Sequence, residues 1–449
     1  MYRRPAMTQR VRSISLPIVL LGVLSLLSLG ARVAWLNDPC QSPCGTSTDH
    51  VLVFDESYYV NAARIIARIA PPPNATYATA PLGDDPNAEH PQLVKLLMAG
   101  SIELLGDGPL AWRLTSLVFG SLAILGMFAL VRAAGGGPWV ALGAATLMAA
   151  DTLLLIHSRI GTLDVPVAAM MIWAAVLYLR GRPLAAGVAI GVGTCMKLVA
   201  PYVLLVLALY EAGRAIRARR ERTRERWWRP VRRLASCGAL AAGVFVGLLA
   251  VLDRIAPPYD PLTSRRVTGG VFGHIAHMLT YAAHQTSPHG PTGIASDPWT
   301  WIVDYKPITY LNVNPSKPVP GLIDVRPAVH FTGVMSPPLM ALALPSLALA
   351  AWTIASQLRG RPGVAEEGEL PLVGLAWFIG TWLPFALLAL LFDRTSYLYY
   401  MVVVMPGIYI TVMYLLYRAR RHRKLIALYA LTVLIAAIAL YPLVPLPWP

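Results

Sequence analysis

Charged residues are scarce in this sequence. Asp, Glu, Lys and Arg make up 14% of the 449 residues, whereas hydrophobic residues make up 56% and the mean hydropathy is +0.55. A water-soluble core cannot bury so large an apolar share, so the composition excludes a soluble globular protein and predicts a polytopic membrane protein. The sequence also has no glycine-rich loop of the Walker or dinucleotide-binding kind.

Cysteine is rare as well, with four residues in the chain. Their spacing fits no zinc site, because Cys195 and Cys237 each stand alone in an apolar stretch. Cys40 and Cys44 lie together in the first polar loop. A disulfide between them requires that this loop face an oxidising compartment.

Acidic residues are fewer than basic ones, 23 against 38, which gives a formal net charge of +15. The arginines cluster between apolar segments, and this pattern is the one that orients a membrane protein. The excess of positive charge therefore indicates membrane topology, and nucleic acid is not expected as a partner.

Eleven apolar segments are expected to cross the membrane. The first can span the hydrocarbon layer of about 30 Å, and it is too long for the apolar core of a cleaved signal peptide, which is the competing interpretation. The two segments near residues 190 and 205 break at Lys197 and Pro201, so we expect a polar pocket to shorten them; one kinked segment is the alternative. The eleven segments are residues 13–36, 110–132, 138–156, 165–179, 184–196, 198–213, 234–252, 337–355, 371–392, 397–417 and 425–441.

The basic loops predict the orientation. Three of the four loops 180–183, 214–233, 356–370 and 418–424 are dense in arginine, so we expect a cytoplasmic N-terminus and an external C-terminus. Two helices, 56–69 and 91–105, are expected to lie along the external membrane surface. The expected organisation is one membrane domain, residues 1–449, with a first helix (13–36), a first external catalytic loop (37–109), central helices (110–252) that include the basic loop 214–233, a large external loop (253–336) and C-terminal helices (337–449).

This topology brings the unusual ionisable residues to one face of the membrane. Asp55 and Glu56 form an acidic pair about twenty residues past the first apolar segment. The alternative is a solvated pair with Asp55 as the N-cap of a short helix, and each cation could by itself be a snorkelling residue. The gathering on one side favours a site; its members are Asp55, Glu56, Glu89, His90, Lys95, Arg113, His157, Arg159, Asp164, Lys197 and Arg394, with His157 and His277 regarded as ordinary boundary histidines.

An acidic pair among several cations suits the transfer of a sugar from a phosphate-linked lipid to a hydroxyl group. The carboxylate would accept the hydroxyl proton as the oxygen attacks the anomeric carbon, and the cations would hold the departing phosphate. Because the lipid tail stays in the bilayer, the phosphate must be held at the membrane boundary, where the cations are expected.

Several short motifs follow one another along the chain. They are Phe54-Asp55-Glu56, His90-Pro91 with Lys95, Trp112-Arg113-Leu114, Ser158-Arg159-Ile160 with Leu163-Asp164, Met278-Leu279-Thr280-Tyr281, Ser287-Pro288-His289-Gly290, Pro298-Trp299-Thr300-Trp301 with Lys306-Pro307-Ile308, and Asp393-Arg394-Thr395-Ser396 with Tyr399-Tyr400 and Pro406. In this order they resemble the protein O-mannosyltransferase family and its bacterial relatives among the lipid-phosphosugar-dependent glycosyltransferases of the GT-C fold. The resemblance covers most of the chain and implies an all-α polytopic membrane protein with about eleven spans.

The resemblance also implies roles for individual residues. Asp55 would be the catalytic base, and Glu56 would shape the acceptor site. The implied donor-binding residues are His90, Lys95, Arg113, Arg159, Asp164, Lys197, Arg394 and Tyr399, and those of the external loop on the acceptor side are His289, Trp299 and Trp301. The chain departs from the family at His90-Pro91-Gln92 and His289-Gly290-Pro291, and residues 253–336 are too few for the β-trefoil domain of the eukaryotic enzymes. These departures bear on the acceptor more than on the donor.

The expected function is that of an inverting glycosyltransferase of a bacterial plasma membrane, working on the external face. The donor would be a polyprenyl-phosphate sugar, with mannose as the expected sugar, and the acceptor a Ser or Thr hydroxyl of an exported protein met near the secretion machinery. One alternative is a GT-C enzyme that transfers a different sugar to a lipid or cell-wall glycan; another is a flippase of lipid-linked sugar, which should carry polar residues at mid-bilayer. No metal ligand set and no cofactor are predicted, although a divalent ion stays open.

Overall fold

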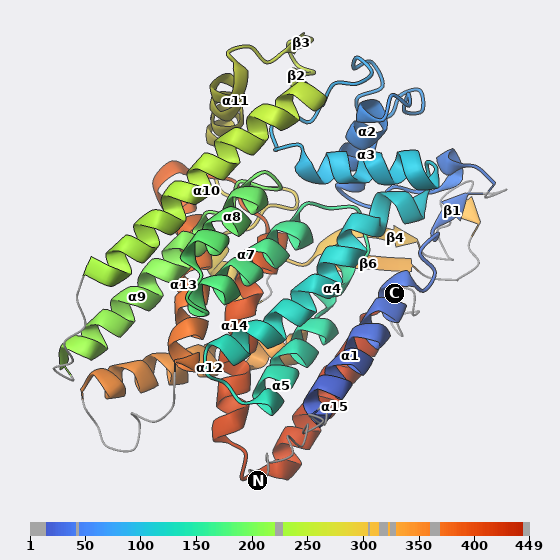
Figure 1. The fold of residues 1–449 in the computed structure, drawn as a ribbon. Helices are drawn as coiled ribbons and strands as arrows, with labels where there is room; N and C mark the ends of the chain where they lie inside the picture. The colour runs from blue at the N-terminus through green and yellow to red at the C-terminus, as the bar shows by residue number, and fades with distance from the viewer. Residues whose placement is uncertain are drawn as a thin grey trace, which may run out of the picture.

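The computed structural model describes residues 15–41, 45–220, 228–303, 306–313, 322–323, 329–359 and 369–442. Helices dominate it (Figure 1). They are α1 (Leu16–Val33), α2 (Glu56–Ile66), α3 (Leu93–Leu105), α4 (Pro109–Ala133), α5 (Pro138–Ala150), α6 (Thr152–His157), α7 (Asp164–Leu179), α8 (Pro183–Thr194), α9 (Tyr202–Arg220), α10 (Trp228–Ile255), α11 (Gly270–His284), α12 (Pro337–Leu358), α13 (Leu370–Phe392), α14 (Met401–Arg418) and α15 (Arg423–Ala439).

Each of the eleven predicted apolar segments coincides with a helix or, for residues 138–156, with the pair α5 and α6. Six helices among the described residues, α1, α4, α10, α12, α13 and the α14 segment, are long and apolar enough to cross a membrane. Three shorter apolar helices, α5, α7 and α8, lie among them. The number of crossings and their orientation remain predictions.

The chain breaks between α8 and α9, as the sequence predicted. Helix α8 ends at Thr194 and α9 begins at Tyr202, so two helices form instead of one kinked segment. The intervening residues include Lys197, which is 5% exposed. Burying a lysine charge is less unfavourable when a carboxylate pairs with it or a cavity admits water or a ligand. Lys197 has both a carboxylate partner and an adjoining cavity.

The two helices expected in the first polar loop are present as α2 and α3. Figure 1 shows that α2, α3 and α11 gather at one end of the bundle, where α3 lies across the upper end of α4. At the opposite end α14 turns into α15. The polar loops at the α2–α3–α11 end therefore come together from distant parts of the chain.

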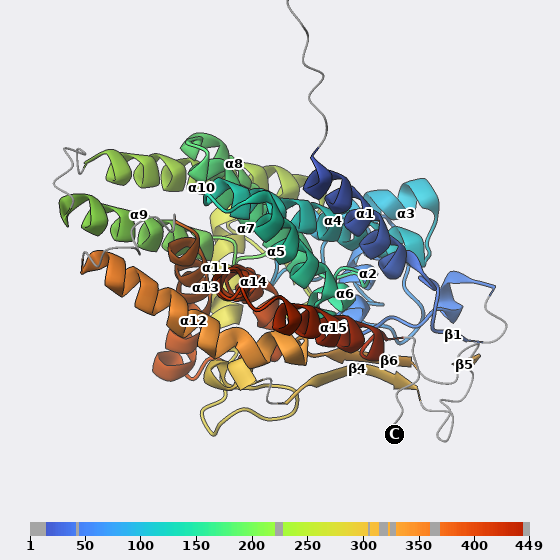
Figure 2. The same ribbon diagram turned by 90° about the horizontal axis from the view of Figure 1, so that it is seen from below.

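The short strands were not predicted. They form three two-stranded antiparallel sheets, β1 (Cys40–Gln41) with β5 (Leu322–Ile323), β2 (Tyr259–Asp260) with β3 (Arg265–Arg266), and β4 (Ile308–Val313) with β6 (Val329–Gly333). Figure 2 shows β4 and β6 side by side along one flank of the helices. Three short 3₁₀ helices, η1 (Ser47–Asp49), η2 (Pro298–Val303) and η3 (Leu398–Tyr400), complete the loops. Cys40 is disulfide-bonded, while Cys44 lies outside the described residues.

A buried ion pair anchors the first loop to the bundle. The Glu56 carboxylate, at the first turn of α2, meets the Arg113 guanidinium of α4 through two contacts of 2.8 Å. The same carboxylate accepts hydrogen bonds from the backbone N–H groups of Val53 (2.8 Å) and Gly161 (2.7 Å). Arg113 also donates to the Leu36 carbonyl. The ion pair thus joins Leu36, just past the first helix, to the first loop, α4 and the turn after α6.

This anchor predicts a large loss of stability for a Glu56→Gln variant. The substitution leaves the Arg113 charge buried without its counter-ion, and breaking such a pair costs about 3–5 kcal/mol. The measurement is thermal unfolding of the detergent-purified full chain. A Glu103→Gln variant, changed at an exposed position of α3, is the control; equal melting temperatures for the two variants would contradict the anchor.

Candidate active site

A cavity of about 510 Å³ opens at the α2–α3–α11 end of the bundle. Its walls come from the loop before α3, the α8–α9 break, α11, the end of α13 and the loop that leads to α14. Most of the lining is apolar. The polar lining residues are Glu89, His90, Lys197, Tyr202, Tyr281, Arg394, Ser396 and Tyr400.

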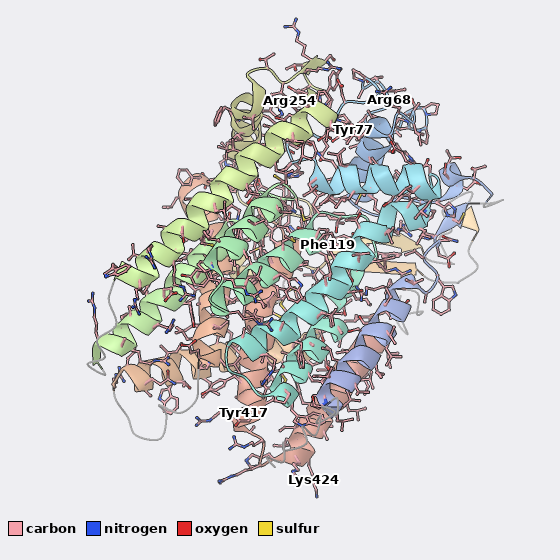
Figure 3. All side chains as sticks on the ribbon, in the orientation of Figure 1. Arg68, Tyr77, Phe119, Arg254, Tyr417 and Lys424 are labelled. Carbon is pink, nitrogen blue, oxygen red and sulfur yellow. The ribbon has the colours of Figure 1, made fainter. Side chains whose placement is uncertain are left out.

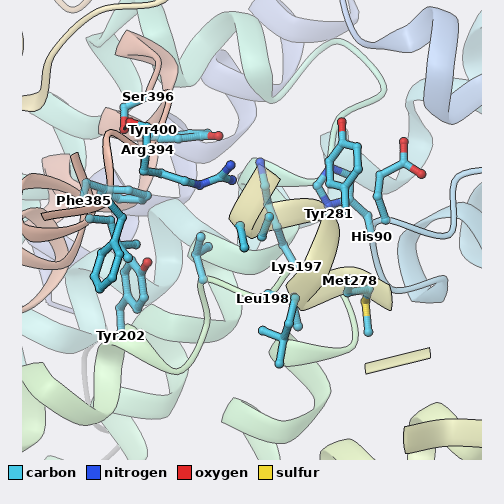
Figure 4. Close-up of a pocket in the computed structure, with 17 residues that line it drawn as sticks. His90, Lys197, Leu198, Tyr202, Met278, Tyr281, Phe385, Arg394, Ser396 and Tyr400 are labelled. Carbon is cyan, nitrogen blue, oxygen red and sulfur yellow. Dashed lines mark hydrogen bonds between the residues drawn. The ribbon is translucent and has the colours of Figure 1, made fainter. Parts of the chain in front are cut away.

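Two cations face each other in this cavity. Figure 4 shows the side chains of Lys197 and Arg394 pointing toward one another across it. Arg394 donates from Nη1 to the Gln285 carbonyl at 3.2 Å. No other hydrogen-bond partner of its guanidinium occurs among the residues that the structure describes. An arginine and a lysine that converge in an apolar cavity have the chemistry to hold a phosphate or another anion.

Lys197 is held in place by Asp164, the first residue of α7. Its Nζ lies 2.6 Å from Asp164 Oδ1. The ammonium also lies 5.4 Å from the ring centre of Tyr399 and 5.5 Å from that of Tyr400, within the range of a cation–π interaction. The predicted group of Asp164, Lys197, Arg394 and Tyr399 is therefore brought together.

Asp55 is a partly buried carboxylate beside this group. It occupies the N-cap position of α2 but makes no capping hydrogen bond. Burial raises its pKa to about 7; the charge of Lys197 lowers the pKa and that of Asp164 raises it further. Asp55 does not line the large cavity itself. Its charge nevertheless acts on the same group, and the carboxyl is poised to exchange a proton near neutral pH.

The backbone before Asp55 is held in an uncommon conformation. Phe54 has φ of +55°, which is rare for a bulky residue. Its ring stacks on Tyr310 of β4, with ring centres 4.0 Å apart, and meets Tyr399 edge-on at 5.5 Å. The Tyr310 hydroxyl lies 2.7 Å from His157 Nε2. Strain of this kind persists where surrounding contacts determine it, commonly at functional sites.

The sequence interpretation regarded His157 as an ordinary boundary histidine and did not single out Tyr310. His157 is fully buried, and its Nδ1 lies 3.9 Å from Asp164 Oδ2. Its place directly before Ser158-Arg159 was the only available signal. Tyr310 lies on a strand that the sequence did not predict.

Three predicted donor-binding cations are engaged elsewhere. Arg113 belongs to the ion pair with Glu56. Lys95 is fully buried, lies 2.6 Å from Asp85 Oδ2 and donates to the carbonyls of Asn87 and His90. Arg159 donates to the carbonyls of Ala34 and Trp35 and to the Tyr441 hydroxyl. None of the three lines the cavity. Lys95 and Arg113 are paired with carboxylates, whereas Nε of Arg159 has no hydrogen-bond partner among the described residues.

Lys95 explains why His90 and Glu89 reach the cavity. By binding the carbonyls of the residues 87–90 turn, it fixes the loop from which both side chains extend. Burial lowers the pKa of His90 well below its usual value, with the positive charges of Lys197, Lys95 and Arg394 adding to the effect. Burial raises the pKa of Glu89. His90 is thus a neutral imidazole beside the two cavity cations.

The predicted acceptor-side residues are dispersed. Trp301 is fully buried and donates from Nε1 to Ser296 Oγ at 3.0 Å, so it is a packing residue of the loop. His289 and Trp299 are exposed. The backbone of their loop joins the cavity wall, because Ser287 N donates to the Asp393 carbonyl at 2.7 Å and Ser296 N donates to the Ser396 carbonyl at 2.9 Å.

An apolar groove of about 350 Å³ adjoins the cavity. It lies among α8, α9, α10 and α11 and shares the lining residues Leu198 and Leu279 with the cavity. Within the described residues, no group of three His, Cys, Asp or Glu side chains could hold a metal ion.

The sequence resembles known mannosyltransferases over part of its length. Residues 89–241 match the family model of dolichyl-phosphate-mannose-protein mannosyltransferases. The polyprenol-phosphate-mannose–protein mannosyltransferase of Corynebacterium glutamicum is 35% identical over 116 residues, which are 25% of this chain and 22% of that protein. The chain thus matches about a fifth of the length of this relative. The predicted resemblance is confirmed.

Solved structures extend the likeness to the fold. The yeast protein O-mannosyltransferase Pmt1-Pmt2 complex, solved with its sugar donor, superposes with a TM-score of 0.68 over 96% of this chain and 90% of that chain, at 12% identity. ArnT from Cupriavidus metallidurans, solved with undecaprenyl phosphate, gives 0.52 over 88% of this chain and 59% of that chain, at 18% identity. The chain therefore has the GT-C fold predicted from its sequence and is a multi-pass membrane protein.

The raised pKa of Asp55 predicts a pH-dependent effect on stability. The folded pKa of about 7 exceeds the unfolded value of 3.8, so the folded state binds more protons between these pH values and its stability falls as pH rises through them. An Asp55→Asn variant lacks this loss. We expect its melting temperature to exceed that of the wild type at pH 8 and to approach it at pH 5, with Glu103→Gln as the control. The same difference at both pH values would show that Asp55 does not titrate in this range.

Proposed function

We propose that the chain is a glycosyltransferase that moves a sugar, with mannose as the expected sugar, from a polyprenyl phosphate to Ser or Thr hydroxyl groups of exported proteins. The proposal rests on one observation: Lys197 and Arg394 point toward each other across a cavity, and the nearby carboxyl group of Asp55 has a pKa of about 7. The match of residues 89–241 to mannosyltransferases supports it.

The donor phosphate would lie between Lys197 and Arg394. Both cations can hydrogen-bond to its oxygens, and the apolar lining strengthens the attraction by excluding water. The polyprenyl tail would leave through the adjoining groove, because Leu198 and Leu279 line both spaces. Two structural relatives, solved with a sugar donor and with undecaprenyl phosphate, support this class of ligand.

Asp55 would act as the general base. Its carboxylate takes the proton of the acceptor hydroxyl while the hydroxyl oxygen forms a bond to the anomeric carbon and the bond to the phosphate oxygen breaks. Attack from the side opposite the phosphate inverts the anomeric configuration. The leaving polyprenyl phosphate keeps the electron pair of the broken bond, and the two cations stabilise the negative charge that develops on it. Protonated Asp55 then returns its proton to water.

The acceptor would enter from the α2–α3–α11 end, which the positive-inside rule assigns to the external face of a bacterial plasma membrane. The exposed His289 and Trp299 lie on a loop that borders the cavity wall. An extended acceptor peptide could lie along the exposed side of this loop. The exposed loop favours a protein acceptor over a second lipid, which would need a further apolar path.

An Asp55→Asn variant is expected to lose turnover by a factor of about 10² to 10⁴, the usual contribution of a general base, while donor binding persists. The assay follows transfer of mannose from a purified polyprenyl-phosphate mannose to a Ser/Thr-rich peptide by the full chain in proteoliposomes, with and without EDTA. Glu103→Gln is the matched control. Full transfer by Asp55→Asn would refute the assignment, and movement of labelled donor between leaflets without transfer would indicate a flippase.

Lys197→Gln and Arg394→Gln variants should bind the donor about tenfold to a hundredfold more weakly, because each removes a hydrogen bond to a charged group. Binding of the polyprenyl phosphate product, measured by microscale thermophoresis, is the readout. Arg265→Gln, at an exposed position of β3, is the matched control. Unchanged affinity in both cavity variants would discard the phosphate site even if Asp55 proved catalytic.

A further inference from the structure

A second apolar groove lies at the opposite end of the molecule. It has a volume of about 390 Å³ and runs between α5, α14 and α15. Its walls include Trp139 and Thr146 of α5, Met413 and Tyr417 of α14, and Ile426, Tyr429 and Val433 of α15. Trp139 is 57% exposed, so the groove opens to the surface of the helix bundle. It shares no lining residue with the cavity that contains Lys197.

A basic turn lies at the mouth of this groove. The turn between α14 and α15 reads Arg418-Ala-Arg-Arg-His-Arg-Lys424 and contains no acidic residue. Figure 3 labels Tyr417 and Lys424 at the end of the molecule opposite Arg68, Tyr77 and Arg254. Arg420 lies over the ring of Tyr417, 4.5 Å from its centre. Because Tyr417 lines the groove, this contact fixes one cation at the groove mouth.

A buried polar atom lies deeper in the same groove. The hydroxyl oxygen of Tyr429 is buried and has no hydrogen-bond partner within the described part of the chain. Tyr429 is six residues beyond Arg423, or about 9 Å along the helix. Tyr429 therefore lies within the apolar part of the groove, away from the basic turn.

We propose that the groove between α5, α14 and α15 binds one anionic phospholipid. One acyl chain lies along the apolar walls, which include Tyr429, and Arg420, Arg421 and Arg423 attract the headgroup. The headgroup is anionic because the turn at the mouth carries four arginines and a lysine, and each basic side chain near a membrane surface favours anionic lipid. Trp139 and Tyr417 lie at this mouth as the amphipathic aromatic residues of a membrane interface do. The lipid would clamp α15 to α5 and α14.

The test uses the purified, delipidated full chain and native mass spectrometry with either phosphatidylglycerol or phosphatidylcholine of the same acyl chains. We expect one phosphatidylglycerol to remain bound at activation energies that remove phosphatidylcholine. The triple variant Arg420→Gln, Arg421→Gln, Arg423→Gln should lower its occupancy at least fivefold. The matched control is Arg180→Gln, Arg182→Gln, Arg229→Gln, which removes the same charge from exposed positions outside the groove.

A second readout places the lipid in the groove. Phosphatidylglycerol with dibrominated acyl chains should quench the fluorescence of Trp139, measured as the part of the signal that a Trp139→Phe variant loses. A Thr146→Trp variant in that Trp139→Phe background fills the groove and should lower lipid occupancy without changing the charge of the mouth. Equal losses in the two triple variants would reduce the effect to general surface charge and overturn the proposal, as would unchanged occupancy after the groove is filled.

Discussion

The structure depends on the hydrogen bonds that the buried carboxylate of Glu56 makes. Glu56 accepts two hydrogen bonds from Arg113 and one each from the backbone of Val53 and Gly161, with none of its bonding capacity left for water. Satisfying one such group requires that the first loop, α4 and the turn after α6 meet at one point. Asp55, its neighbour in the sequence, is consequently carried to the group of Asp164 and Lys197.

Adjacent carboxylates therefore have opposite properties. Glu56 is fully hydrogen-bonded and stabilises the fold. Asp55 makes no capping hydrogen bond, and burial raises its pKa to about 7. The same division applies to the cations. Arg113 and Lys95 are paired with carboxylates and, like Arg159, bind backbone carbonyls of nearby loops, while Lys197 and Arg394 meet in the cavity. A polar residue near a membrane boundary is thus assigned to fold or site by how many partners the protein supplies.

Much of the fold could be predicted because membrane helices must satisfy their own backbone hydrogen bonds and expose apolar side chains. That constraint produces long apolar segments. The eleven segments, the break near Lys197 and the two loop helices could therefore be predicted from short stretches of the sequence. The strands were not, because two- to six-residue strands depend on distant partners such as β4 with β6. Tyr310, and with it the support of Phe54, was hidden for that reason.

The sequence by itself determined the class of protein, the positions of its apolar segments and the set of ionisable residues from which the site is drawn, since apolar length and the order of short motifs are local properties. Only the tertiary structure decided which cation faces the cavity and which is bound within a wall. Lys95 and Lys197 are alike in the sequence, each a lysine among apolar residues. They differ because the residues 85–90 turn wraps around one ammonium group, while a single carboxylate holds the other at the edge of an open space.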